Sequence, residues 1–180
     1  FGRAIGHEEA GGIGQRELGL IRDIAVVPGG RWVVTAGEDR SARLWDADSL
    51  RSLGVPMGHE SNVNAVSVVA QGRVICTATH DGTVKLWMIG RVRESCALRG
   101  HEGLVFDTVF DPTGKRILSA SSDGTAKLWD VETGRELMGM EEHDAEVRAA
   151  SFSSDGRTAA TGDRDGAIYL WDVSSGGKAV

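Results

Sequence analysis

Tryptophan recurs along this 180-residue chain at a fixed interval of 42 residues. Three further series keep that interval: an acidic residue six positions before each Trp, a hydroxyl residue ten positions before it, and a histidine in the last three copies. The members are Thr35, Asp39 and Trp45; His59, Thr77, Asp81 and Trp87; His101, Ser119, Asp123 and Trp129; and His143, Thr161, Asp165 and Trp171. A period of this length predicts a repeat architecture in which each copy is one supersecondary unit.

Each copy has the pattern of four short strands. An apolar, β-branched run such as residues 63–69 precedes a turn, and a second strand leads to the hydroxyl residue. Asp-Gly pairs then give a strong hairpin signal in three copies, whereas the first copy has Asp39-Arg40. A third strand ends at Trp, and the fourth is more polar, as expected of an outer edge. Glycine contributes 25 residues, which fits frequent tight turns, and we expect an all-β fold.

The chain resembles the WD-repeat β-propeller family. The resemblance depends on the Gly-His and Trp-Asp pairs that bound each copy: Gly58-His59, Gly100-His101, Trp45-Asp46, Trp129-Asp130 and Trp171-Asp172. It implies four blades, each of four antiparallel strands, as part of a larger ring of about seven blades. We expect blades at 17–58, 59–100, 101–142 and 143–180, with residues 1–6 as the outer strand of a preceding blade.

The resemblance also implies a role for the periodic residues. In each blade the Asp is expected to bind the His, the His the Ser or Thr hydroxyl, and the hydroxyl the indole N–H of Trp. A catalytic set is needed only once, so three full copies favour this buried structural relay over catalysis. The first copy has Glu17 where His is expected. Either His7 supplies the missing residue, with residues 8–19 as an enlarged loop, or this blade lacks its His.

Two residues break the pattern elsewhere. Trp32 is off-period, since its equivalents are Val74, Arg116 and Thr158. It is expected either to make a contact on the opposite face or to cover a junction with a missing neighbour. Met88 stands where an Asp follows the other tryptophans, and we expect this loss to be tolerable because that Asp belongs to an outer turn.

Positions that differ between repeats are candidates for specificity. By family resemblance, three positions in each blade correspond to partner contacts at the mouth of the channel. They are Leu20, Arg22 and Glu38; Asn62, Asn64 and His80; Leu104, Phe106 and Ser122; and Glu146, Arg148 and Arg164. Phe106 beside Leu104 predicts an apolar anchor, and Arg148 with Arg164 predicts a cationic edge.

Net charge and the distribution of residue types argue against some classes of partner. A formal net charge of −6 and the lack of a basic run argue against nucleic acid, and no run is long enough to span a membrane. No leader is visible. Cys76 and Cys96 lack paired or metal-binding spacing, so we expect free thiols, a reducing compartment and a cytoplasmic location. No cofactor or metal is expected, because no phosphate loop, calcium loop or zinc motif is complete.

The predicted function is a non-catalytic protein-interaction scaffold, or a sensor or docking module of a larger multidomain protein. The expected partners are proteins or peptides at the channel mouth, together with further blades from a parent chain or a second copy. One alternative is a hydrolase-type enzyme built on a propeller, with Asp23, Asp107 and His80 at the channel. Another is a purely structural spacer.

Overall fold

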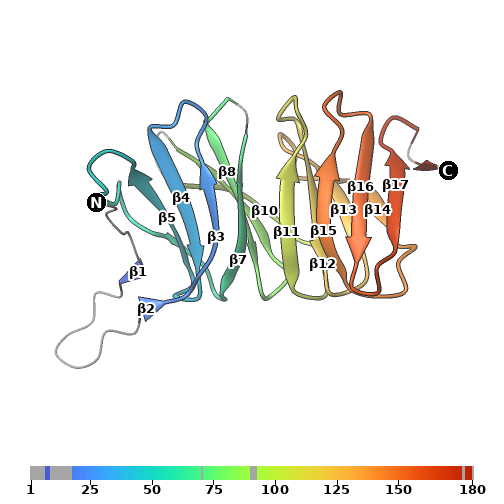
Figure 1. Ribbon diagram of the computed structural model, residues 1–180, viewed down its shortest axis with the longest axis horizontal. Helices are drawn as coiled ribbons and strands as arrows, with labels where there is room; N and C mark the ends of the chain where they lie inside the picture. The colour runs from blue at the N-terminus through green and yellow to red at the C-terminus, as the bar shows by residue number, and fades with distance from the viewer. Residues whose placement is uncertain (1–6, 9–17, 70, 90–92, 176, 180) are drawn as a thin grey trace.

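The computed structural model describes residues 7–8, 18–69, 71–89, 93–175 and 177–179 (Figure 1). They form four four-stranded antiparallel sheets and one two-stranded ribbon, and the strands of every sheet are neighbours in chain order. The predicted all-β architecture of four antiparallel sheets is thereby confirmed. The described residues contain no helix long and apolar enough to cross a membrane.

The strands follow the 42-residue period. The first sheet contains β3 (Ile21–Val26), β4 (Trp32–Gly37), β5 (Ser41–Asp46) and β6 (Met57–Gly58). The second contains β7 (Val63–Val68), β8 (Val74–Thr79), β9 (Val84–Met88) and β10 (Arg93–Leu98). The third contains β11 (Val105–Phe110), β12 (Arg116–Ser121), β13 (Ala126–Asp130) and β14 (Glu136–Met140). The fourth contains β15 (Val147–Phe152), β16 (Thr158–Asp163), β17 (Ile168–Asp172) and β18 (Gly177–Ala179).

The beginning of the chain is described only in part. β1 (His7–Glu8) pairs with β2 (Leu18–Gly19), with His7 opposite Gly19. The expected outer strand at residues 1–6 and most of the expected loop at 8–19 lie outside the described residues, and so does the side chain of His7. A role for His7 in the relay of the first blade therefore stays a prediction.

The four sheets lie side by side in chain order, with the first and fourth sheets at opposite ends of the row (Figure 1). Their first strands, β3, β7, β11 and β15, are successive neighbours. The three spaces between sheets hold three apolar clusters, and each combines residues of two adjacent sheets. Trp87, Trp129 and Trp171 each pack into the cluster shared with the preceding sheet. The periodic tryptophans therefore hold adjacent sheets together as well as marking the repeats.

The hairpins between second and third strands show why three copies carry Asp-Gly. Gly82, Gly124 and Gly166 have φ of 82°, 81° and 92°, in the left-handed region that glycine enters without steric cost. In the first sheet Arg40 adopts a φ of 59° at the equivalent position. The hairpin geometry is thus kept where glycine is absent, and Arg40 carries the local strain.

Candidate functional site

The periodic residues meet inside each sheet, and the third sheet shows the complete arrangement. Trp129 Nε1 donates to Ser119 Oγ at 2.8 Å, and Ser119 Oγ lies 2.7 Å from His101 Nε2. His101 Nδ1 lies 2.9 Å from Asp123 Oδ2. A carboxylate can only accept, so Nδ1 carries the proton and Nε2 accepts the serine hydroxyl. All donors and acceptors of this chain of bonds are satisfied by protein groups, which fits a structural role.

The first and second sheets contain the same hydroxyl and indole bond. Trp45 Nε1 donates to Thr35 Oγ1 at 2.8 Å, and Trp87 Nε1 donates to Thr77 Oγ1 at 2.9 Å. In the second sheet His59 Nε2 lies 2.8 Å from Thr77 Oγ1, while Nδ1 lies 2.9 Å from the carbonyl of Met57.

The turn aspartates of these two sheets bind their own hairpins. Asp81 accepts the hydroxyl of Thr79 at 2.6 Å, and Asp39 accepts the hydroxyl of Ser41 at 2.9 Å. Asp39 also forms an ion pair with Arg43 at 2.9 Å. These carboxylates therefore stabilise the β4–β5 and β8–β9 turns.

The fourth sheet departs from the prediction at one residue. His143 Nε2 lies 2.7 Å from Thr161 Oγ1, and Trp171 Nε1 donates to Thr161 Oγ1 at 2.8 Å. However, His143 Nδ1 binds Asp163 Oδ2 at 2.8 Å, so assigning Asp165 to this relay was wrong. Asp163 also accepts the backbone N–H of Asp165 and Ala167, and thereby takes over the turn as well.

Burial sets the ionisation of the complete relay. Desolvation lowers the pKa of His101 below its usual value, and the hydrogen bond to Asp123 only partly offsets this. Burial opposes ionisation of Asp123 too, but hydrogen bonds from Thr125 and His101 outweigh it and lower the pKa to about 2. At neutral pH the relay thus contains a neutral imidazole and a carboxylate.

We expect acid to destabilise the protein in two windows. Below a pH of about 6.5, unfolded chains bind a proton at His101 that the folded state resists, so stability falls as pH falls. The contribution of Asp123 is present above pH 3.8, its unfolded value, and is lost as pH falls towards 2. Thermal unfolding between pH 7 and 4 measures the first effect. His101→Gln should flatten that dependence, and the exposed His80→Gln should not; an unchanged slope in His101→Gln would contradict the assignment.

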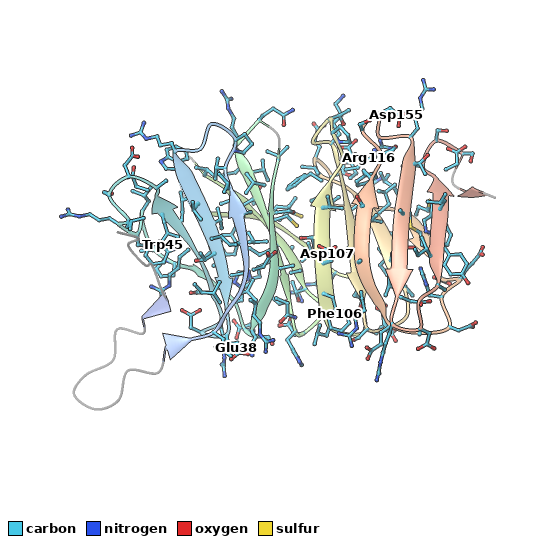
Figure 2. All side chains as sticks on the ribbon, viewed as in Figure 1. Glu38, Trp45, Phe106, Asp107, Arg116 and Asp155 are labelled. Carbon is cyan, nitrogen blue, oxygen red and sulfur yellow. The ribbon has the colours of Figure 1, made fainter. Side chains whose placement is uncertain are left out.

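The twelve expected partner positions lie in one repeated backbone arrangement. In each sheet the residue before the first strand accepts, through its carbonyl, the N–H of the residue before the turn Asp. The four bonds are Glu38 N to Leu20 O at 3.0 Å, His80 N to Asn62 O at 2.9 Å, Ser122 N to Leu104 O at 2.8 Å, and Arg164 N to Glu146 O at 2.9 Å. Figure 2 shows Glu38 and Phe106 at the same end of the sheets. We call the twelve-residue surface at this end the loop face.

The third expected partner position of each sheet lies in a β-bulge, which was not predicted from the sequence. Register shifts by one residue between Ile21 and Asp23, and at the equivalent place in the other three sheets. The four residues left without a pairing partner are Arg22, Asn64, Phe106 and Arg148. A bulge changes the direction of a side chain without ending the strand, so these four residues do not take part in the regular pairing of the sheet.

Side chains on the loop face contact one another across sheets. The guanidinium carbon of Arg148 lies 3.8 Å from the ring centroid of Phe106, a cation–π contact between the third and fourth sheets. Arg148 also pairs with Glu146, and Arg22 pairs with Glu38. Asn64 Nδ2 donates to the carbonyl of Val105 at 3.2 Å. Of the two arginines of the expected cationic edge, Arg148 contacts Phe106 and Glu146, and Arg164 is exposed to solvent.

The acidic residues considered for catalysis bind the neighbouring sheet. Asp23 Oδ2 accepts the N–H of Val66 at 2.8 Å, and Asp107 Oδ2 accepts the N–H of Ala150 at 2.9 Å. Burial raises the pKa of Asp107, and backbone hydrogen bonds from Ala150 and Thr108 offset part of the rise. His80 is exposed on the loop face. Within the described residues, no group of three or more His, Cys, Asp or Glu side chains could hold a metal ion.

Comparison with known families agrees with this architecture. The family model described as WD domain, G-beta repeat matches residues 14–46, 50–88, 93–130 and 134–172. The chain belongs to the WD40 repeat family. WD40 repeats commonly serve as protein-interaction scaffolds and are typically non-catalytic. Among curated proteins, none matches this sequence.

Proposed function

We propose that this WD40 chain is a non-catalytic scaffold that docks a protein or peptide partner on its loop face. The observation that carries the proposal is the bulge at the start of every sheet. It places Arg22, Asn64, Phe106 and Arg148, three residue types on one repeated backbone, at the same end of the four sheets. Because the backbone arrangement is constant and the side chains vary between sheets, the side chains of the loop face can determine which partner binds.

The centre of this surface is the pair formed by Phe106 and Arg148. Aromatic residues and arginine are both enriched in the cores of protein interfaces, and arginine is frequent among the residues that contribute most binding energy. Leu104, two residues before Phe106 in the chain, is a half-buried apolar residue of the same loop face. This cluster supports a docking function over a purely structural spacer, since packing of the sheets does not require it.

The hydrolase-type alternative has less support. Its two aspartates are hydrogen-bonded to the backbone of adjacent sheets, where they close the junctions between first and second and between third and fourth sheets. A catalytic carboxylate needs access to a substrate, and these have a structural bonding partner instead.

Two exposed apolar faces suggest a further partner. On the first sheet Ile24 and Val26 are 57% and 63% exposed, whereas their equivalents Val66 and Phe110 are buried against the preceding sheet. On the fourth sheet Ile168 is 75% exposed, although its equivalents Ala42, Val84 and Ala126 are fully buried by the following sheet. We propose that a further blade of the same kind, from a longer chain or a second copy, covers each face.

A peptide-display selection on the 180-residue chain tests the docking proposal. The affinity of an enriched peptide should fall about tenfold or more for Phe106→Ala and Arg148→Ala, because both remove the central cluster. Arg164→Ala should weaken it less. Leu137→Ala, which truncates an exposed residue of the outer strand β14, is the control. Undiminished binding by all three loop-face variants would overturn the proposal.

We place this function in the cytoplasm. Both cysteines are free thiols, and burial raises the pKa of the Cys76 thiol to about 12. Free thiols without a disulfide framework suit a reducing compartment.

A further inference from the structure

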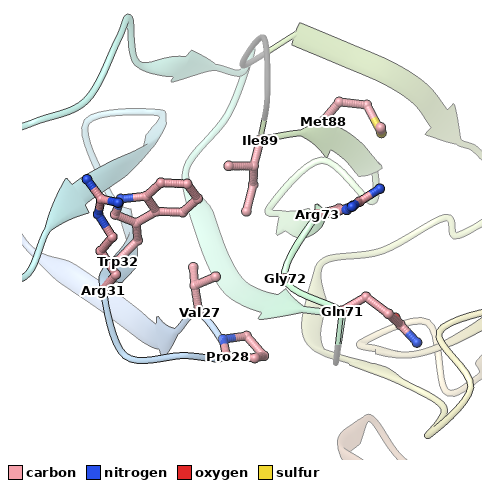
Figure 3. A pocket seen from close by; sticks show the side chains of 9 residues that line it. All are labelled: Val27, Pro28, Arg31, Trp32, Gln71, Gly72, Arg73, Met88 and Ile89. Carbon is pink, nitrogen blue, oxygen red and sulfur yellow. The ribbon is translucent and has the colours of Figure 1, made fainter.

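A cavity of about 610 Å³ lies between the first and second sheets (Figure 3). Its walls come from the β3–β4 turn, the β7–β8 turn and the end of β9. Those turns join first to second strands, so they lie at the opposite end of the sheets from the hairpins of the loop face. Figure 2 shows Asp155, in the corresponding β15–β16 turn, at that opposite end. The cavity is therefore a separate site, with a volume typical of ligand pockets.

The two residues that break the repeat pattern converge on this cavity. Trp32 forms one wall and Met88 another, Ile89 lies between them, and Val27 also lines the cavity (Figure 3). At the position of Met88 the other repeats have Asp46, Asp130 and Asp172, which accept backbone N–H groups of their own turns. Met88 has no carboxylate to do this, and it is 39% exposed beside the cavity.

The equivalent junction between the third and fourth sheets is bridged. Arg116, at the position of Trp32, donates from Nη2 to the carbonyl of Gly156 at 2.8 Å. Asp111 holds the same guanidinium at 3.1 Å. Trp32 forms no hydrogen bond of this kind with the part of the chain that the structure describes, and its ring lies under the guanidinium of Arg31 at 5.7 Å. The change from Arg to Trp therefore replaces a hydrogen bond that crosses between two sheets by an apolar wall.

Two arginines flank the apolar walls. Arg31 and Arg73 lie on opposite sides of the cavity, one on each sheet (Figure 3). Arg31 is only weakly paired, since Nε lies 4.0 Å from Asp46 and the side chain is 75% exposed. Arg73 is exposed and forms no ion pair with the described residues. The cavity is therefore apolar in the middle and has one guanidinium group available on each side. A ligand with an apolar group between two carboxylates would match this arrangement.

We propose that this cavity binds an acidic peptide segment that inserts one large apolar side chain between the two sheets. The inserted side chain packs on Trp32, Met88 and Ile89, and the flanking Asp or Glu residues pair with Arg31 and Arg73. A peptide supplies carboxylates on both sides of its anchor, which the positions of the two arginines require. This site does not depend on the proposed function of the loop face.

Fluorescence anisotropy with a labelled, end-capped Glu-Glu-Phe-Glu-Glu peptide tests the proposal on the 180-residue chain. Binding should weaken about tenfold or more when Glu is replaced by Gln or Phe by Ala in the peptide. Arg73→Ala should weaken it similarly, and Met88→Asp, which restores the residue of the other repeats, should do so as well. Added salt should also weaken binding, because the contacts are ionic.

Matched variants separate this site from general charge and from the loop face. Arg157→Ala changes the residue equivalent to Arg73 in the fourth repeat, and it should leave binding unchanged. Phe106→Ala should also leave it unchanged. No binding at millimolar peptide, or equal loss in Arg73→Ala and Arg157→Ala, would overturn the proposal. Binding that survives Glu to Gln replacement would do so too, since it would show a purely apolar ligand.

Discussion

Replacing Ser119 by Ala should destabilise the protein by about 2–4 kcal/mol, although only one oxygen is lost. Ser119 is fully buried and is the hydroxyl that both His101 and Trp129 contact. Its removal leaves the indole N–H without an acceptor and the imidazole nitrogen without a donor, in a site closed to water. The desolvation cost of both groups is then uncompensated.

Thermal and denaturant unfolding measure this loss, at roughly 2–4 °C in Tm per kcal/mol for a chain of this size. Ser154→Ala is the control, because Ser154 is exposed in the β15–β16 turn and should change stability by less than about 0.5 kcal/mol. If the two variants unfold alike, the relay contributes nothing to stability, and its periodic recurrence would need another explanation.

Leu128→Ala should cost about 2–5 kcal/mol, whereas Leu170→Ala should cost less than about 1 kcal/mol. The two leucines occupy the same repeat position, yet Leu128 is 2% exposed and Leu170 is 45% exposed. Leu128 is covered by the fourth sheet in a shared apolar cluster. Truncating it removes packed methyl groups and leaves a cavity, while truncating Leu170 removes groups that are already partly exposed to solvent.

Equilibrium unfolding of both variants at low protein concentration makes the comparison. A small effect of Leu128→Ala would contradict the packing of the third and fourth sheets. An equal cost for both variants would show that the face around Leu170 is buried in solution by a second copy, which sedimentation would detect as a dimer. The pair of variants therefore tests the core and the covered-face proposal together.

Much of the fold could be predicted because the information is local and repeated. The Asp-Gly turns, the apolar first strands and the tryptophan at the end of each third strand each specify a piece of a four-stranded sheet. Their period of 42 residues then specifies how many such pieces there are. Where one copy lacks a residue of the pattern, the other copies still predict its structure. At Arg40, for example, the hairpin forms without the glycine of the other three copies.

The fourth relay shows where periodicity fails. Asp163 and Asp165 are both acidic, and only Asp165 is in register with the other turn aspartates. The equivalents of Asp163 are Thr79 and Ser121, whose hydroxyls bind the turn. A carboxylate at this position reaches His143 Nδ1 as well as the backbone of the turn. Asp163 therefore binds the histidine because of its position in space, although Asp165 is the residue in register.

The all-β repeat and the positions at which the copies differ follow from the amino-acid sequence alone, since both depend on spacing along one chain. Which of the differing residues meet depends instead on how the sheets pack against one another. Phe106 lies under Arg148, and Trp32 and Met88 line one cavity, because neighbouring sheets bring together residues about 42 positions or more apart. Exposure was decided the same way: Ile168 differs from Val84 and Ala126 by having no following sheet among the described residues, and burial is a property of neighbours in space.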